Sequence, residues 1–190
     1  MSFGYPARPQ CIGNAVKQAS DQQIVMFAAA SNDGGNKGIP FPPSFSSRVI
    51  CVNSANGLGG ASSFNPPLQS GHNFSVLGEA VKSAWPLHLG NKEERRQWGT
   101  STSTPIAAAI AALVMEFARQ LPVNIKHFER LKSLEGMSAV FKDMSVLKDG
   151  YDYVVPLELL DCNHNDRTLI ESRISLALMR LFGLVLTGTE

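Results

Sequence analysis

The stretch that decides the fold is GTSTSTPIAAAIAAL, residues 99–113. Its second half is apolar at nearly every position, which predicts a helix buried in the middle of a domain. Proline suits the first helical turn, where no backbone donor is needed, so Pro105 predicts a helix start close by, with Ser103 or Thr104 as the cap. Ser101 then lies at the positive end of the helix dipole, where a hydroxyl group is held at a fixed point.

Apolar runs upstream of this helix predict strands. Residues 24–30, IVMFAAA, are apolar at every position, which is typical of a central strand in a parallel sheet covered by helices. A dense turn signal follows at residues 31–36, and shorter apolar runs at 49–52 and 74–77 predict two further strands. An apolar stripe at helical spacing precedes the first strand, at Ile12, Ala15, Val16 and Ala19. Strands that alternate with helices indicate an α/β fold.

The composition changes after Pro122. Apolar residues at helical spacing predict helices near residues 128–134 and 140–144, and a third helix that begins after a cap at Asp166. We therefore divide the chain into an α/β part, residues 1–122, and a helical C-terminal segment, residues 123–190.

Composition excludes several classes of function. The 190 residues are 44% hydrophobic and 17% charged, with a net charge of +1, so no basic surface for nucleic acid is expected. The longest apolar run, residues 106–115, is half of the roughly 20 residues that a membrane helix needs. The three cysteines form no disulfide pattern, and no signal peptide opens the sequence. For the chain as written we expect a cytoplasmic location, which does not hold for a fragment of a longer protein.

Residues 99–113 resemble the nucleophile motif of the subtilisin-like serine proteases. That motif is Gly-Thr-Ser, two small or medium residues, Thr or Ser, and a Pro that opens a buried helix. Upstream, VMFAAASNDGGN (residues 25–36) is similar to the family strand that ends in Ala-Ala-Ala-Gly-Asn. MSFG at residues 1–4 resembles the strand edge on which substrates lie. RVICVNSAN and ASSFNPP follow in the family's order.

The resemblance implies a subtilisin-like parallel sheet with flanking helices, present as a partial domain, and a serine endopeptidase that acts on polypeptides. It implies Ser101 as the nucleophile and Asn32 as a donor to the oxyanion. The residues that it places against substrate are Ser2, Phe3, Gly4, Ala30, Ser31, Asp33 and Thr100. No cofactor is implied; the family often binds structural calcium, but no carboxylate cluster in the sequence places such a site.

The family's Asp and His motifs are not in this sequence. They precede the oxyanion strand in the family, whereas His72, His88, His127 and His164 all follow it here. A start within a strand favours truncation over a processed half or a decayed relative. We expect the isolated chain to be a very poor protease that needs Asp and His from a missing N-terminal segment. A catalytically inactive, protein-binding remnant is the alternative.

Other interpretations of the same residues stay open. Ser101 as an ordinary capping or loop serine is disfavoured by the motif around it. An α/β-hydrolase fits poorly because the sequence has no Gly-x-Ser-x-Gly elbow. Cys162 and His164 offer two metal ligands at most, so a polar turn is preferred there over zinc.

Overall fold

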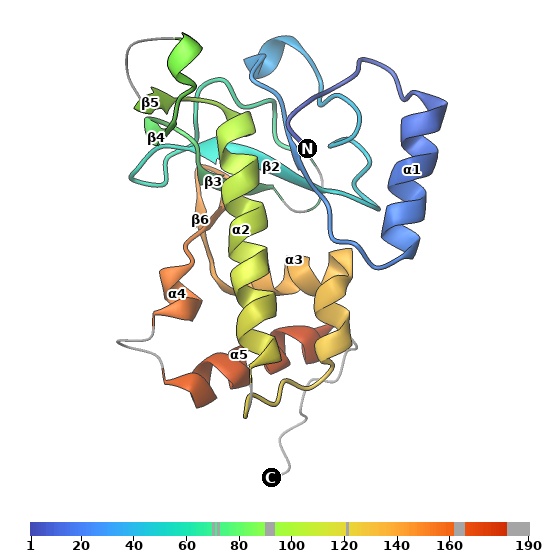
Figure 1. The fold of residues 1–190 in the computed structure, drawn as a ribbon, viewed down its shortest axis with the longest axis vertical. Coiled ribbons are helices and arrows are strands. Elements are labelled where there is room, and N and C mark those ends of the chain that lie inside the picture. The colour runs from blue at the N-terminus through green and yellow to red at the C-terminus, as the bar shows by residue number, and fades with distance from the viewer. Residues whose placement is uncertain (70, 72, 90–93, 121, 162–165, 182–190) are drawn as a thin grey trace.

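The computed structural model describes residues 1–69, 71, 73–89, 94–120, 122–161 and 166–181. The elements of these residues follow one another along the chain as shown in Figure 1. In chain order they are α1 (Gln10–Asp21), β1 (Phe27–Ala29), η1 (Gly34–Asn36), β2 (Ile50–Ala55), β3 (Phe74–Leu77), β4 (Val81–Ala84), η2 (Leu87–Leu89), β5 (Glu94–Gln97), α2 (Thr100–Arg119), η3 (Phe128–Lys132), α3 (Leu134–Asp143), β6 (Ser145–Lys148), β7 (Tyr151–Val154), α4 (Leu157–Leu160) and α5 (Arg167–Arg180).

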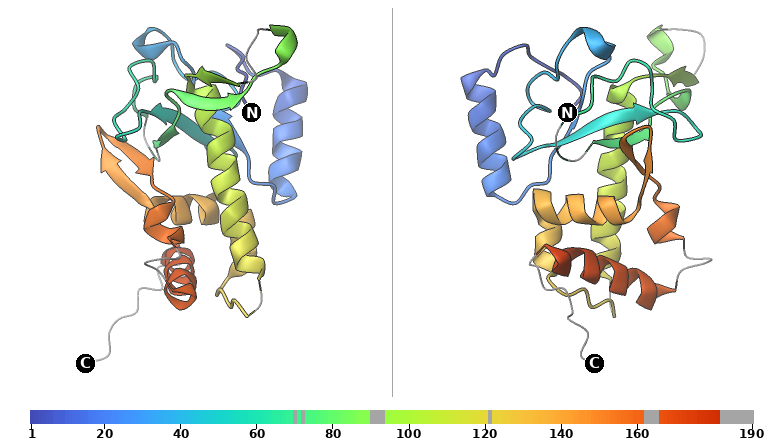
Figure 2. Two further views of the ribbon diagram at one scale, coloured as in Figure 1. Left: turned by 60° about the vertical axis from the view of Figure 1, so that its left-hand side comes forward. Right: turned by 180° about the vertical axis from the view of Figure 1, so that it is seen from behind.

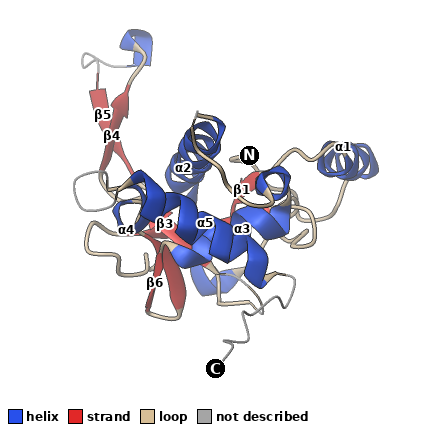
Figure 3. Cartoon of the chain, turned by 90° about the horizontal axis from the view of Figure 1, so that it is seen from below, coloured by secondary structure: helices blue, strands red, loops and turns tan. Residues whose placement is uncertain are grey.

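A five-stranded sheet with the order β1-β2-β3-β7-β6 forms the centre of the molecule. The first four strands of this order run parallel, and β6 pairs antiparallel with β7. In register, Phe27 lies opposite Ile50, while Phe74 lies opposite Val52 on one side and Asp152 on the other. A separate hairpin of β4 and β5 stands away from this sheet (Figure 3). The structure confirms the predicted α/β class with its mainly parallel sheet.

Helices cover both faces of β1 because its successive side chains point to opposite faces. Phe27 packs in the larger core cluster with α2, and Ala28 packs in a second cluster with Val16 of α1 and Phe41. Helix α2 lies along β1, β2 and β3, and Figure 2 (right) shows the sheet from the side opposite that helix. Burial on both faces explains why this strand is apolar at every position.

The residues after 122 add to the same core. The ring of Phe141 in α3 lies tilted against Phe27 and edge-on to Phe74, with ring centroids 5.4 and 5.6 Å apart. The predicted cap of the last helix is confirmed, because Asp166 accepts a hydrogen bond of 2.7 Å from the Leu169 N–H. The sequence analysis missed β6 and β7, two short strands in a segment that we expected to be helical. The division of the chain at residue 122 stays a prediction.

Helix α2 begins earlier than the sequence analysis placed it. Its N-cap is Gly99 and its first residue is Thr100, so the predicted cap at Ser103 or Thr104 is wrong. Pro105 consequently lies beyond the first turn, within the helix. The helix is long and apolar enough to cross a membrane by length and composition, which the core helix of a soluble domain also satisfies. Here α2 packs on three strands.

Two residues at the start of α2 and the end of β1 have backbone angles that glycine favours. Gly99 has φ of +135°, and a Cβ atom there would lie 2.8 Å from the Asn32 amide nitrogen. Ser31 has φ of +133°, which is rare for a residue with a side chain. Nearby, Gly78 leaves room for Ser103 Oγ, which would lie 2.0 Å from a Cβ atom at this position.

Replacing Gly99 with alanine tests the first of these constraints. We expect Gly99→Ala to lower the free energy of unfolding by roughly 2 kcal/mol or more, because both the positive φ and the contact with Asn32 oppose a Cβ atom. Gly35→Ala is the matched control, since no atom lies within 4 Å of a Cβ atom there. Urea unfolding of both variants measures the difference; equal stabilities would contradict this account.

The strain at Ser31 gives the opposite prediction. Ser31→Gly should raise the free energy of unfolding by about 1 kcal/mol. The strained φ of Ser31 destabilises the folded state by about 1–3 kcal/mol, and glycine removes this strain. Glycine also increases the conformational entropy of the unfolded chain, which offsets part of the gain. Thermal and urea unfolding measure the effect. A variant less stable than the parent would show that the bonds of the Ser31 hydroxyl outweigh the strain.

Candidate active site

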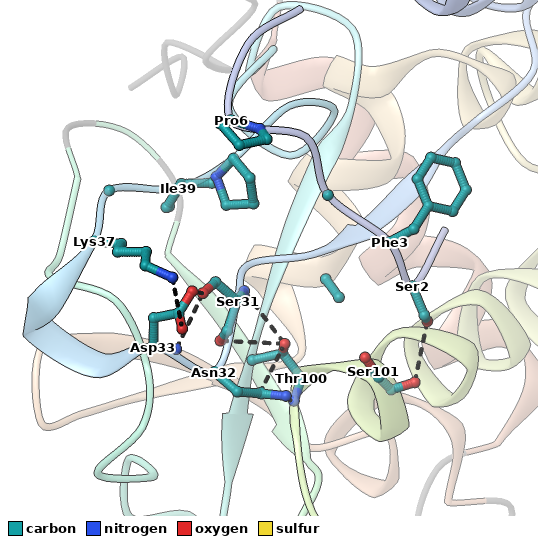
Figure 4. Close-up of a pocket in the computed structure, with 14 residues that line it drawn as sticks. Ser2, Phe3, Pro6, Ser31, Asn32, Asp33, Lys37, Ile39, Thr100 and Ser101 are labelled. Atoms are coloured by element: carbon teal, nitrogen blue, oxygen red, sulfur yellow. Dashed lines mark hydrogen bonds and ion pairs between the residues drawn. The ribbon is translucent and has the colours of Figure 1, made fainter.

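A cavity of about 540 Å³ lies at the carboxyl end of β1, beside the start of α2. Its walls come from three segments that are distant in sequence (Figure 4). Of the predicted site residues, it is lined by Ser2, Phe3, Gly4, Ser31, Asn32, Asp33, Thr100 and Ser101. Open α/β sheets place their binding sites at such strand ends.

The side chain of Asn32 is fixed by the first residue of α2. Its Oδ1 atom accepts a hydrogen bond of 2.8 Å from the Thr100 N–H and lies 3.1 Å from the Thr100 hydroxyl oxygen. The same hydroxyl accepts from the Ser31 N–H at 3.3 Å. A helix start has backbone donors without intrahelical partners, and Asn32 satisfies one of them from another loop. Because Oδ1 is engaged there, the NH₂ group of Asn32 is the part that can donate to a ligand.

Ser101 is the second residue of α2 and is exposed to solvent at the cavity. The Thr102 N–H donates to the Gly99 carbonyl at 2.9 Å, and Thr100 is capped by Asn32. Within the described part of the chain, neither the N–H nor the hydroxyl of Ser101 donates a hydrogen bond. A nucleophilic oxygen, a backbone donor and the positive end of the helix dipole therefore face one space.

The segment of residues 1–5 forms a second wall and is anchored at both ends. The Met1 ammonium donates to the Phe27 carbonyl at 2.6 Å, and the Met1 carbonyl accepts from the Ala29 N–H at 3.0 Å. Burial lowers the pKa of this ammonium group. At the other end, Tyr5 exchanges two backbone hydrogen bonds of 2.8 and 3.0 Å with Phe41.

The backbone between these anchors has unused hydrogen-bonding groups. Phe3 and Gly4 make no backbone hydrogen bond to any described residue, so an extended peptide can pair with them as an added strand. A side chain at position 4 would not fit, because its Cβ atom would lie 2.6 Å from Pro40. The segment is thus a short, narrow strand edge beside Ser101.

The charges at the cavity cancel. Asp33 accepts from the Ser31 hydroxyl at 3.1 Å and lies 3.5 Å from the Lys37 ammonium. Both side chains of the ion pair are about half exposed or more, 48% for Asp33 and 71% for Lys37. Solvent weakens such a pair. The carboxylate of Asp33, which the sequence analysis places against substrate, is thus already paired with Lys37.

The structure leaves Ala30 out of the cavity. Ala30 is fully buried, and its N–H donates to the Val52 carbonyl at 3.0 Å within the sheet. Ala29 lines the cavity instead, whereas Ala30 is buried. The sequence analysis also missed the loop after η1, which contributes Lys37, Gly38, Ile39 and Pro40. The turn residues of this loop predict that the chain reverses direction, but they do not predict which part of the molecule the loop contacts.

Among the described residues, no histidine lines this cavity. His88 lies in η2 and His127 precedes η3, whereas His72, Cys162 and His164 lie outside the described residues. Within the described part of the chain, no group of three His, Cys, Asp or Glu could hold a metal ion. Burial raises the pKa of Cys51 to about 12, so this thiol is protonated at neutral pH and is a poor nucleophile.

Comparison with known proteins places these features in a family. The family model described as "Subtilase family" matches residues 1–151. The chain is 28% identical over 173 residues to the subtilisin-like protease het-Q2 of Podospora anserina, and the match covers 84% of this chain and 47% of that protein. It is 31% identical over 116 residues to the minor extracellular protease Epr of Bacillus subtilis, covering 61% of this chain and 17% of Epr.

Solved structures agree at the level of the fold. The prenylagaramide maturation protease PagA superposes with a TM-score of 0.60 at 16% identity, covering 93% of this chain and 58% of PagA. The S218A mutant of the PatA protease domain gives a TM-score of 0.65 at 17% identity, covering 83% of this chain and 56% of that domain. The chain spans about half the length or less of the two curated relatives. The resemblance inferred from the motifs is confirmed: this chain belongs to the subtilase family of serine proteases.

Proposed function

We propose that this chain supplies the nucleophile, the oxyanion hole and the substrate-binding edge of a serine endopeptidase. The observation that carries the proposal is the position of Ser101 at the start of α2, beside the Asn32 side chain and the edge at residues 2–4. The substrate is a polypeptide, paired with the backbone of Phe3 and Gly4. No feature of the cavity selects one substrate sequence.

The reaction that fits these groups is acyl transfer. The Ser101 oxygen attacks the carbonyl carbon of the scissile peptide bond while a base takes the hydroxyl proton. Negative charge develops on the carbonyl oxygen, where the Ser101 N–H and the Asn32 NH₂ group donate. The amine leaves with a proton from the same base, and water then hydrolyses the acyl-enzyme.

The base has to come from residues that do not line this cavity. In a subtilisin, loss of the histidine base lowers turnover by about 10⁶-fold, which leaves about 10³–10⁴ over water. We infer that the Asp and His come from an N-terminal polypeptide segment that docks on this chain. An inactive binding module is the outcome if no such segment joins it.

Two features of the fold support a docking surface for that segment. Residues Ala108, Ala109, Ala112 and Leu113 form an exposed apolar face on α2, where Leu113 is 60% exposed. Met1 pairs with the outer edge of β1 by bonds to Phe27 and Ala29, so a parallel strand fits there. The relatives contain further polypeptide beyond the part that matches this chain, which is enough to cover such a face.

Labelling with a fluorophosphonate probe tests the proposed function. We expect slow labelling of the chain alone and fast labelling after a polypeptide that carries the family's Asp and His motifs is joined before Met1. Ser101→Ala is the control and should not be labelled in either form. Far-UV circular dichroism and cooperative unfolding verify that each sample is folded. A folded sample that is unlabelled in both forms would reject the endopeptidase and favour the inactive module.

Two substitutions at Asn32 separate its two contacts. Asn32→Asp keeps an oxygen acceptor for the Thr100 N–H but removes the NH₂ donor, so stability should hold while labelling falls about 10²–10³-fold, the loss known for this donor in a subtilisin. Asn32→Ala removes both contacts and should also lower the free energy of unfolding by ~1 kcal/mol. Labelling of Asn32→Asp at the parent rate would exclude Asn32 from the oxyanion hole.

A further inference from the structure

Pro105 leaves a carbonyl of α2 without its helical partner. In an α-helix the C=O of one residue accepts from the N–H four residues later, and the fourth residue after Ser101 is Pro105, which has no N–H. The Ser2 hydroxyl donates to this carbonyl at 3.2 Å (Figure 4). The group that loses its partner thus belongs to the proposed nucleophile itself.

The neighbouring carbonyls of the first turn have other donors. The Gly99 carbonyl accepts from the N–H groups of Thr102 and Ser103 at 2.9 and 3.3 Å. The Thr100 carbonyl accepts from the Thr104 hydroxyl at 2.8 Å. The Ser101 carbonyl accepts from Ser2, which reaches it from a segment 99 positions away in sequence.

The position of Ser2 is fixed by the sheet. Met1 is hydrogen-bonded to β1 through its ammonium group and its carbonyl, and Tyr5 is hydrogen-bonded to Phe41. The hydroxyl of Ser2 therefore connects the sheet to the start of α2. The carbonyl carbon that it holds is bonded to the Cα atom of Ser101, and the same Cα atom carries the side chain of Ser101.

We propose that Ser2 is a positioning residue for the Ser101 nucleophile, its hydroxyl replacing the N–H that Pro105 lacks. This inference rests on the proposed function. It links the edge that binds substrate to the residue that attacks it, because Ser2 and the pairing residues Phe3 and Gly4 are consecutive. Small displacements of a reacting atom cause large losses of rate, so a single contact at this carbonyl is enough to matter.

A double-substitution experiment tests the inference. Ser2→Ala should lower the rate constant of fluorophosphonate labelling at Ser101 about fivefold, the scale of one exposed hydrogen bond, and Ser2→Thr, which keeps the hydroxyl, should restore it. Pro105→Ala supplies the missing N–H. In that background Ser2→Ala should change the rate by less than about 1.5-fold, because the carbonyl is bonded within the helix. Equal losses in both backgrounds, or no loss from Ser2→Ala, would overturn the proposal.

The contact can be followed without activity. Ser2→Ala should change the carbonyl ¹³C chemical shift of Ser101 relative to the parent protein. The same substitution made in the Pro105→Ala variant should leave the shift at the value that Pro105→Ala alone gives. Failure of the proposed function appears as a folded, unlabelled parent protein in which this shift still responds. An unchanged shift in Ser2→Ala, whatever the labelling, rejects the role of Ser2 alone.

Discussion

The hydrogen bond from the Thr100 N–H to Asn32 Oδ1 connects the two elements that make the site. One partner is the first donor of α2, and the other follows the end of β1. The bond satisfies a helix donor that would otherwise need water and at the same time orients the Asn32 NH₂ group. Gly99 makes this approach possible, because any side chain at that position would strike Asn32. The proposed oxyanion-hole geometry thus follows from how the helix start is capped.

The packing behind the site explains why α2 can hold a reactive residue in place. Its buried face shares one cluster with the sheet and with α3 and α5, and Phe141 of α3 joins Phe27 to Phe74 from behind. Residues far beyond the nucleophile motif therefore support it. The second cluster, with α1 and Phe41, supports the opposite face of β1 and the loop that bonds Tyr5.

The sequence was most informative where burial dictates the pattern. The apolar runs located the strands β1, β2 and β3 and the helix α2, and the motifs located most of the cavity lining. Local rules failed where distant contacts decide the outcome. Pro105 normally marks a first turn, but α2 starts five residues before it, and the Ser2 hydroxyl donates to the carbonyl of Ser101. Strand β7 forms because β3 offers it an edge, and Ala30 is removed from the cavity by its bond to Val52.

The unequal anchoring of the two halves of the site has a kinetic consequence. Ser101 belongs to a helix packed into the main core, so its backbone changes position only when a large part of the fold opens. Asn32 lies in an exposed loop held by the Thr100 cap and by the Gly34–Phe64 hydrogen bond of 2.9 Å. Opening of that loop alone would displace the Asn32 side chain while Ser101 stays in place. The lifetime of the assembled site is therefore set by the loop, and ligands that bridge Asn32 and Ser101 lengthen it.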